Sequence, residues 1–459
     1  MINENKKYNL DSYKRAQRQK SGKEQAVVSR LQKIFIGMSL TATVLALILA
    51  GAFLGKRSGL SDTVIGRSAG SEATGETTDF VATFSTEATT TPFTVTESLP
   101  VNALADNYWG PLEECPDPIP YEHVPVHGIY LNAAMYLDQN LTLIENSELD
   151  SVVIDLKESD GIYYNTNNQT ALSVGNGYVR NIINLPAICQ ECHSRGARVI
   201  GRIVCFKDPM MADAFPDRAV CDSTGQPLRF SNEGSETFLS PYDSRNWDYF
   251  IELAEEAIEM GVDEIQFDYV RFPTGSSISG NSPYFGPENE VPGKADAINR
   301  FLQTARIRIQ DTLGVPLSAD VFGIAVTSSL DGDLLGQDWA TMGFTGVDSL
   351  CPMIYPSHYA LGTYLNGRSY DTPDKYPYDI MYNALEVGSR RHDREGYSVV
   401  RPYIQAFTAA YIGAGNYMDY DYTAINDQIR AVQDAGLSEF ILWNAACEYP
   451  EGNYSGNNG

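Results

Sequence analysis

Eight β-rich apolar runs, separated by segments long enough to hold a helix, constrain the fold of this chain more than any other feature. The runs are 127–136, 151–157, 198–206, 262–272, 316–324, 347–355, 399–407 and 439–444. Helical spacing of apolar side chains fills 179–195, 243–260, 294–313 and 420–435 between them. Alternation of strands and helices predicts a parallel sheet, and eight such units predict closure into a (β/α)8 TIM barrel. An open doubly wound sheet is the alternative, but no glycine-rich phosphate turn follows the first run.

The fourth run ends abruptly in polar residues and a proline, in the sequence Val-Asp-Glu-Ile-Gln-Phe-Asp-Tyr-Val-Arg-Phe-Pro over residues 262–273. Side chains alternate along a strand, so Glu264, Gln266 and Asp268 should share one face, with Ile265 and Phe267 on the other. Barrel enzymes carry their chemistry at the carboxyl ends of the strands. The alternation therefore predicts that Asp268 faces the mouth of the barrel.

Other runs also end in polar or aromatic side chains, although charged groups on buried strands are costly unless they are paired. Several strands that deliver such residues to one end of a barrel predict a pocket there. For the substrate-binding part of this pocket we expect Lys157, Arg202, Lys207, Gln266, Arg271, Tyr355, Gln405, Phe407, Trp443 and Asn444. Any single pair among the charged residues could instead be a structural ion pair that fixes the barrel register.

The residue types narrow the chemistry to carboxyl groups and aromatic rings. The chain has no Gly-x-Ser-x-Gly elbow, no His-Glu-x-x-His helix and no phosphate loop, and it has only five histidines. These absences disfavour a serine hydrolase, a zinc protease and a nucleotide enzyme, and we expect no cofactor and no metal. Glycoside hydrolysis needs two carboxyl groups, one that protonates the leaving oxygen and one that attacks carbon or activates water. Aromatic rings, Tyr163 among them, suit the apolar faces of sugars.

Three aspartates are the candidates for the catalytic pair. Asp268 is predicted to be the nucleophile or charge stabiliser, kept ionised by Arg271 and Lys157 nearby. Asp320, in the apolar sequence Ser-Ala-Asp-Val-Phe at 318–322, is the candidate acid. Asp155 is the rival for either role, with Lys157 as its partner. Glu158 and Asp160 follow in a loop and are expected to be solvated.

Three motifs in order resemble one family. They are Val-Val-Ile-Asp-Leu-Lys at 152–157 with Asp-Gly at 160–161, Val-Ile-Gly-Arg-Ile-Val-Cys-Phe-Lys-Asp-Pro at 199–209, and the 263–273 segment. Together they are similar to the putative glycosyl hydrolase barrels of bacterial surface proteins, which are distantly similar to α-amylase-type barrels. The resemblance covers about 124–449 and implies a (β/α)8 fold and action on carbohydrate.

The resemblance also bears on single residues. It places the nucleophilic aspartate of the α-amylase pattern on Asp268. That pattern has a glutamate acid at the end of the fifth strand, where this chain has Asp320. It also has a His-Asp pair on the seventh strand, where Gln405 stands.

The N-terminal region predicts a membrane anchor. Residues 34–54 contain no charged side chain and match the roughly 20 residues that cross a bilayer as a helix. Residues 1–33 are rich in Lys and Arg, which should hold this end in the cytoplasm and place the rest outside. A cleaved signal peptide is the competing interpretation, because Ala50-Gly51-Ala52 offers small residues to a peptidase.

The amino-acid composition predicts a stalk, the charge of the expected ligand and the absence of a disulfide framework. Residues 55–106 are rich in Ser and Thr, which predicts a flexible stalk before a barrel domain at 107–459. The formal net charge of −26 disfavours nucleic acid as a partner and favours a neutral or cationic ligand. Seven scattered cysteines, including the Cys189-x-x-Cys192 pair, indicate no disulfide framework.

The sequence thus predicts a cell-membrane, single-pass extracellular glycoside hydrolase that acts on a cell-wall or environmental polysaccharide. A non-catalytic carbohydrate-binding barrel at the cell surface is the alternative. The two differ in whether Asp268 and Asp320 face one pocket at roughly 5 to 10 Å separation.

Overall fold

A closed barrel of eight parallel strands forms the centre of the computed structural model, which describes residues 102–392 and 395–456. The barrel strands are β1 (His127–Leu131), β2 (Ser151–Glu158), β4 (Arg198–Val204), β7 (Glu264–Asp268), β8 (Leu317–Phe322), β9 (Ser349–Ile354), β13 (Tyr403–Gln405) and β14 (Phe440–Trp443). Each strand pairs with the next in this order, and β1 pairs with both β2 and β14, which closes the sheet. The predicted (β/α)8 barrel is confirmed, and each of the eight apolar runs overlaps one of its strands.

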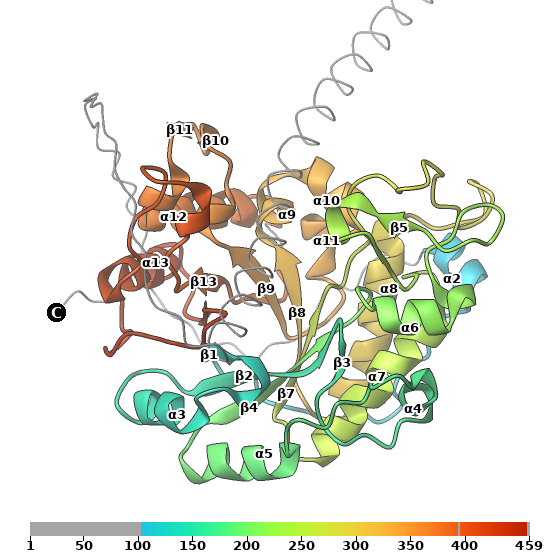
Figure 1. The fold of residues 1–459 in the computed structure, drawn as a ribbon, viewed down its shortest axis with the longest axis horizontal. Helices are drawn as coiled ribbons and strands as arrows, with labels where there is room; N and C mark the ends of the chain where they lie inside the picture. The colour runs from blue at the N-terminus through green and yellow to red at the C-terminus, as the bar shows by residue number, and fades with distance from the viewer. Residues whose placement is uncertain (1–101, 393–394, 457–459) are drawn as a thin grey trace, which may run out of the picture.

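Helices surround the barrel on its outer side (Figure 1). They are α2 (Ala103–Trp109), α3 (Leu137–Glu145), α4 (Gln169–Val174), α5 (Leu185–Ser194), α6 (Pro209–Ala214), α7 (Ser244–Glu259), α8 (Lys294–Arg306), α9 (Gly323–Thr327), α10 (Ser329–Leu335), α11 (Trp339–Met342), α12 (Pro377–Ser389) and α13 (Tyr422–Asp434). A π-helical turn, 307–311, continues α8. Short strands lie between these elements: β3 (Gly161–Ile162), β5 (Arg229–Phe230), β6 (Glu236–Thr237), β10 (Thr363–Leu365), β11 (Arg368–Tyr370) and β12 (Val399–Val400).

Helix α7 shows how the local sequence specifies these elements. The Asp243 side chain accepts a hydrogen bond from the Arg245 backbone N–H and so caps the first turn. The buried face includes Trp247, Phe250 and Ala254, which recur at helical spacing. Gly261 follows the helix with a φ of 106°, a backbone conformation that favours glycine.

The apolar core lies between the barrel wall and the helices. Phe267 on β7 packs against Phe301 on α8, with ring centroids 5.3 Å apart. Phe206 contacts both Phe301 and Phe250 of α7 edge-to-face. Phe267 therefore faces outward, as the alternation along the fourth run predicted, and its neighbours in the strand face the barrel interior.

The barrel interior contains polar layers rather than a purely apolar filling. Glu264 accepts a hydrogen bond from Arg401 at the bottom, 2.6 Å. Gln266, one layer higher, accepts one from Tyr403 and donates to the Cys351 sulfur. Asp268 forms the third layer at the carboxyl ends of the strands.

An ion network closes the bottom of the barrel. Arg401 is fully buried and donates to Glu264 and Glu439. His123 lies 3.0 Å from Asp348 and 2.6 Å from Glu439 through its two ring nitrogens. Burial opposes the charged imidazole, but the two carboxylates outweigh it and raise the pKa of His123 to about 10. This network fixes strand register at the end opposite the candidate site.

The segment before β1 runs along the outside of the barrel. In α2, Trp109 packs on Tyr242 and Trp247, and Asp106 pairs with Arg300 of α8. These contacts make α2 part of the folded domain, which therefore begins before the boundary predicted at Asn107.

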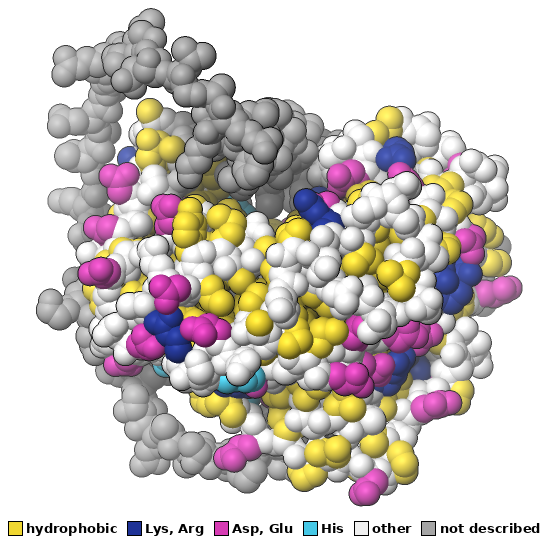
Figure 2. All heavy atoms as spheres, turned by 60° about the horizontal axis from the view of Figure 1, so that its bottom comes forward, with side chains coloured by type: hydrophobic (Ala, Val, Ile, Leu, Met, Phe, Trp, Pro, Cys, Tyr) yellow, Lys and Arg dark blue, Asp and Glu magenta, His cyan; other side chains and the backbone are white. Residues whose placement is uncertain are grey.

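No helix within 102–392 and 395–456 is long and apolar enough to cross a membrane. The predicted basic tail, membrane span 34–54 and most of the stalk lie outside the described residues. Acidic side chains are spread over the face of the barrel domain shown in Figure 2, with apolar side chains between them.

Candidate active site

Arg202 lies at the centre of a group of carboxyl groups at the mouth of the barrel. Its Nη1 donates to Asp155 Oδ1 and Glu158 Oε1, both at 2.5 Å. Its Nη2 and Nε donate to Asp268 Oδ2 at 2.5 and 3.1 Å. Nε also lies 3.8 Å from Asp320 Oδ2. The neighbouring strands β2, β4, β7 and β8 thus bring four carboxyl groups to one guanidinium, which we call the Arg202 cluster.

The geometry of Asp268 and Asp320 fits a catalytic pair. Asp268 Oδ2 and Asp320 Oδ2 lie 3.1 and 3.8 Å from Arg202 Nε, so these two oxygens are at most about 7 Å apart, below the upper limit of roughly 10 Å for glycosidase carboxyl pairs. The structure thus brings the two predicted side chains together around Arg202 at one mouth.

Asp320 is the member of the cluster that has fewest partners. Only 1% of its surface is exposed, and its Oδ1 has no hydrogen-bond partner. Burial, followed by the negative charge of Asp268, raises the pKa of Asp320 well above its usual range. A buried carboxyl group of this kind can hold a proton at neutral pH.

Asp155 is held by Arg202 and by Tyr130, whose hydroxyl donates to Oδ2 at 2.5 Å. Burial raises the pKa of Asp155 to about 7, although Arg202 opposes this effect. Burial also tends to raise the pKa of Glu158, but the positive charge of Arg202 outweighs this effect, so the pKa of Glu158 is lowered. The side chain of Glu158 is 26% exposed, which makes it the most accessible carboxylate of the cluster.

A β-bulge explains why Glu158, and not Lys157, reaches the mouth. The register between β2 and β4 shifts between Asp155 and Lys157, so the strand alternation is displaced by one residue. Lys157 is consequently buried outside the barrel interior, where its Nζ lies 2.9 Å from Asp208 and 5.7 Å from the Phe250 ring centroid. The prediction that Lys157 partners Asp155 or Asp268 is wrong. Glu158 belongs to β2 rather than to a loop, and it is paired with Arg202 while its side chain stays partly exposed.

The backbone after Asp268 turns sharply. Tyr269 has a φ of 52°, in the left-handed region that a tyrosine rarely adopts, and its N–H donates to Asp268 Oδ1 at 2.5 Å. Strain of this kind costs roughly 1–3 kcal/mol and is concentrated at functional sites. The turn ends β7 four residues before the predicted limit of the strand and orients the Asp268 carboxylate.

Aromatic rings line one side of the mouth. Trp443 stacks on Tyr355 at 5.6 Å and on Tyr130 at 5.9 Å, and Phe407 meets it edge-to-face at 5.2 Å. Trp443 and Phe407 are half-buried, so part of each ring is available to a ligand. The structure thus brings the predicted Tyr355, Phe407 and Trp443 together in one aromatic group. Tyr130 was not predicted, although it lies in the first apolar run.

Arg271 does not contact Asp268, contrary to prediction. It is buried and donates to Glu233, at 2.8 Å through Nη1, and its guanidinium lies over the Tyr269 and Phe322 rings. Lys207 also lies near Tyr269: its Nζ is 5.3 Å from the centroid of that ring, and its side chain is 21% exposed. Arg271 therefore stabilises the packing around Tyr269, whereas the partly exposed Lys207 can contact a ligand.

Three predicted ligand-binding amides are fully engaged in internal hydrogen bonds. Gln266 belongs to the middle interior layer described above. Gln405 is buried, accepts from the Ser357 N–H and donates to Asp374. Asn444 donates to the carbonyls of Ala406 and Glu448. These contacts indicate structural roles, and sequence alternation alone could not distinguish them from ligand-binding positions.

The comparisons with known proteins concern the family and the fold of the barrel domain. Residues 124–449 match a family model described as “Putative glycosyl hydrolase domain”. A search of curated proteins found no match. Among solved structures, the glycoside hydrolase domain of PgaB (BpsB) from Bordetella bronchiseptica is 13% identical, with 71% of this chain and 95% of that chain covered and a TM-score of 0.50.

Two further solved structures have lower TM-scores. A hypothetical protein from Ruminiclostridium thermocellum is 35% identical over 42% of this chain and 97% of its own, with a TM-score of 0.37. The α-galactosidase of Thermus thermophilus is 11% identical over 72% of this chain and 60% of its own, with a TM-score of 0.41.

Proposed function

The chain belongs to the family described as “Putative glycosyl hydrolase domain”, and we propose that it hydrolyses a cell-wall or environmental polysaccharide outside the cell, anchored by its N-terminal helix. The observation that carries this proposal is the Arg202 cluster, in which Arg202 binds the Asp268 carboxylate and lies 3.8 Å from the buried carboxyl group of Asp320, whose Oδ1 has no hydrogen-bond partner.

In the proposed reaction, Asp320 gives its proton to the glycosidic oxygen as the bond from that oxygen to the anomeric carbon breaks. Asp268 attacks the anomeric carbon or stabilises its developing positive charge. Water then supplies the hydroxyl that replaces the leaving sugar, and its proton restores Asp320. Asp155 is the rival proton donor, since its pKa of about 7 also suits a general acid.

The surroundings of the pair support a carbohydrate as the ligand. The half-buried rings of Trp443 and Phe407 offer apolar faces against which a sugar ring can pack. Arg202 compensates the charge of Asp268 through two hydrogen bonds and so maintains the position of this carboxylate when the leaving group departs.

The cellular location is supported by the sequence alone. Residues 34–54 have the length and apolar composition of a spanning helix, and the basic residues before it favour a cytoplasmic N-terminus. The barrel domain would then lie on the external side, as a substrate in the cell wall requires.

The proposal is tested with the purified full-length chain on a panel of bacterial-wall and plant polysaccharides. Asp268→Asn and Asp320→Asn should each reduce sugar release by at least about a hundredfold while the proteins remain folded. Asp331→Asn, which alters a buried aspartate on α10 outside the cluster, is the matched control and should retain activity.

The burial of Asp155, Asp268 and Asp320 favours one second candidate, a barrel that binds carbohydrate without cleaving it. Binding of a polysaccharide by the wild type and both Asn variants, with no sugar released by any of them, would replace the hydrolase with this candidate.

A further inference from the structure

The loop between β9 and α12 carries a small hairpin whose outer face is exposed. In the hairpin, Tyr364 of β10 pairs with Ser369 of β11, and the alternate pair is Leu365 with Arg368. Leu365 is buried, whereas Tyr364 is 71% exposed, the largest value among the exposed large apolar side chains in 102–392 and 395–456. Leu361, just before the hairpin, is 56% exposed. Tyr364 and Ser369 therefore share the face that points away from the core.

Side-chain hydrogen bonds attach the hairpin to α12. Its outer face, which carries Tyr364, remains exposed. Its turn residues Asn366 and Gly367 both have positive φ, as a two-residue hairpin turn requires. Asn366 donates to Asn383 at 2.7 Å, and Arg368 donates to Asp379 at 2.6 Å, both partners being on α12. An aromatic ring presented on such an ordered support loses little entropy when it binds a ligand.

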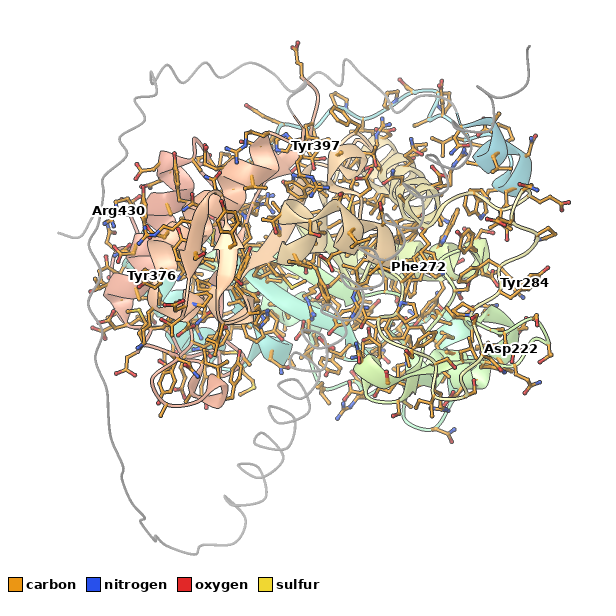
Figure 3. All side chains as sticks on the ribbon, turned by 90° about the horizontal axis from the view of Figure 1, so that it is seen from above. Asp222, Phe272, Tyr284, Tyr376, Tyr397 and Arg430 are labelled. Carbon is orange, nitrogen blue, oxygen red and sulfur yellow. The ribbon has the colours of Figure 1, made fainter. Side chains whose placement is uncertain are left out.

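The base of this loop is connected directly to the mouth of the barrel. Gln405 of β13 bonds to Ser357 and to Asp374, which are located at the two ends of the segment that contains the hairpin. Tyr355, immediately before the segment, belongs to the aromatic side of the mouth. Tyr376 follows the hairpin and lies on the side of the domain formed by C-terminal elements, opposite Tyr284 (Figure 3). The hairpin is thus a rigid extension of one rim of the site.

We propose that the outer face of the β10–β11 hairpin, with Tyr364 at its centre, is a binding platform for the distal part of a polysaccharide chain whose reacting unit lies at the Arg202 cluster. This inference rests on the proposed function for the reacting unit and adds that the substrate is a polymer rather than a small glycoside. One aromatic ring beside a hydroxyl group suits a sugar unit. A stable protein interface buries roughly 800 Å² on each side, whereas the large exposed apolar side chains within 357–374 are Leu361 and Tyr364.

The test measures binding separately from hydrolysis. The full-length chain carrying Asp268→Asn is run by native affinity electrophoresis in gels that contain soluble starch, xylan, galactomannan or glycol chitosan. In this background Tyr364→Ala should weaken binding to the retarding polysaccharide by roughly three- to tenfold. Tyr364→Phe retains the ring and should bind within about twofold of the parent. Tyr284→Ala, an exposed tyrosine on the opposite side, is the matched control.

Unchanged binding by Tyr364→Ala, an equal loss in Tyr284→Ala, or no retardation of the parent in any of these gels would overturn the platform. With Asp268 present, Tyr364→Ala should also lower kcat/KM on the polymer and leave it unchanged on a short chromogenic glycoside. Absence of all hydrolysis, together with Tyr364-dependent retardation, would remove the proposed hydrolase function but leave the platform in place.

Discussion

Replacement of Arg202 by methionine removes the one cation that four carboxyl groups share. The side chain donates four hydrogen bonds, two of them to Asp268, and only 9% of Arg202 is exposed. Methionine has a similar length but no charge, so the carboxylates of Asp155 and Asp268 would remain buried without their partner. Removal of one member of a buried ion pair typically costs about 3–5 kcal/mol, which is the loss expected near pH 7.5.

The cost should depend on pH in a definite direction. Arg202 lowers the pKa of Glu158 and opposes the rise in that of Asp155. Without Arg202 the native state binds at least one more proton near neutral pH, whereas the unfolded state is unchanged. The stability lost on mutation therefore shrinks by roughly 1.4 kcal/mol per pH unit and per proton as pH falls. Two pH units should reduce the cost by about 3 kcal/mol.

The assay is urea unfolding of the full-length wild type and variant at pH 7.5 and 5.5, followed by the fluorescence of the barrel tryptophans. Arg401→Met is the matched control, because Arg401 is also buried and is paired with Glu264 and Glu439 at the opposite end of the barrel. Both variants should lose stability, but only Arg202→Met should shift the pH profile of sugar release. A cost for Arg202→Met that does not change with pH, or the same shift in Arg401→Met, would refute the reasoning.

Further predictions concern the cluster, the hairpin base and the anchor. Asp155→Asn should become more stable relative to the wild type as pH rises from 4 to 7, by up to roughly 4 kcal/mol. The reason is that the pKa of Asp155 is raised in the native state, so its ionisation destabilises the wild type. Thermal unfolding of both proteins at pH 4 and pH 7 measures the difference. Glu158→Gln should lower sugar release at least about tenfold, because Glu158 is one of the carboxylates that Arg202 binds at the mouth. It should change the free energy of unfolding by less than about 1 kcal/mol, because its side chain is partly exposed. Kinetics and urea unfolding would separate these two effects. Gln405→Leu should cost about 1–3 kcal/mol by removing the hydrogen bond to the buried Asp374 Oδ1, and limited proteolysis should then cut 355–376 faster. The full-length chain should stay in the membrane fraction after alkaline extraction, and deletion of 34–54 should release it.

The strands and the direction of their inner faces could be predicted from the sequence because both follow from local periodicity. Alternation along 264–268 correctly placed Asp268 inside and Phe267 outside. The same rule assigned Lys157 to the interior, and there it failed, because a bulge between β2 and β4 is a property of the paired strands. Glu158 was missed for this reason.

The sequence by itself determined the barrel, the end of it that carries the polar residues, and the convergence of Asp155, Arg202, Asp268 and Asp320, since strands of a closed parallel barrel all end at one rim. Only the tertiary structure decided which charges pair. Arg271 binds Glu233, 38 residues away, and Arg202 rather than Arg271 compensates Asp268. The physical reason is that a periodic pattern fixes which face a side chain occupies, whereas its partner depends on the register and loops that bring distant segments within hydrogen-bond distance.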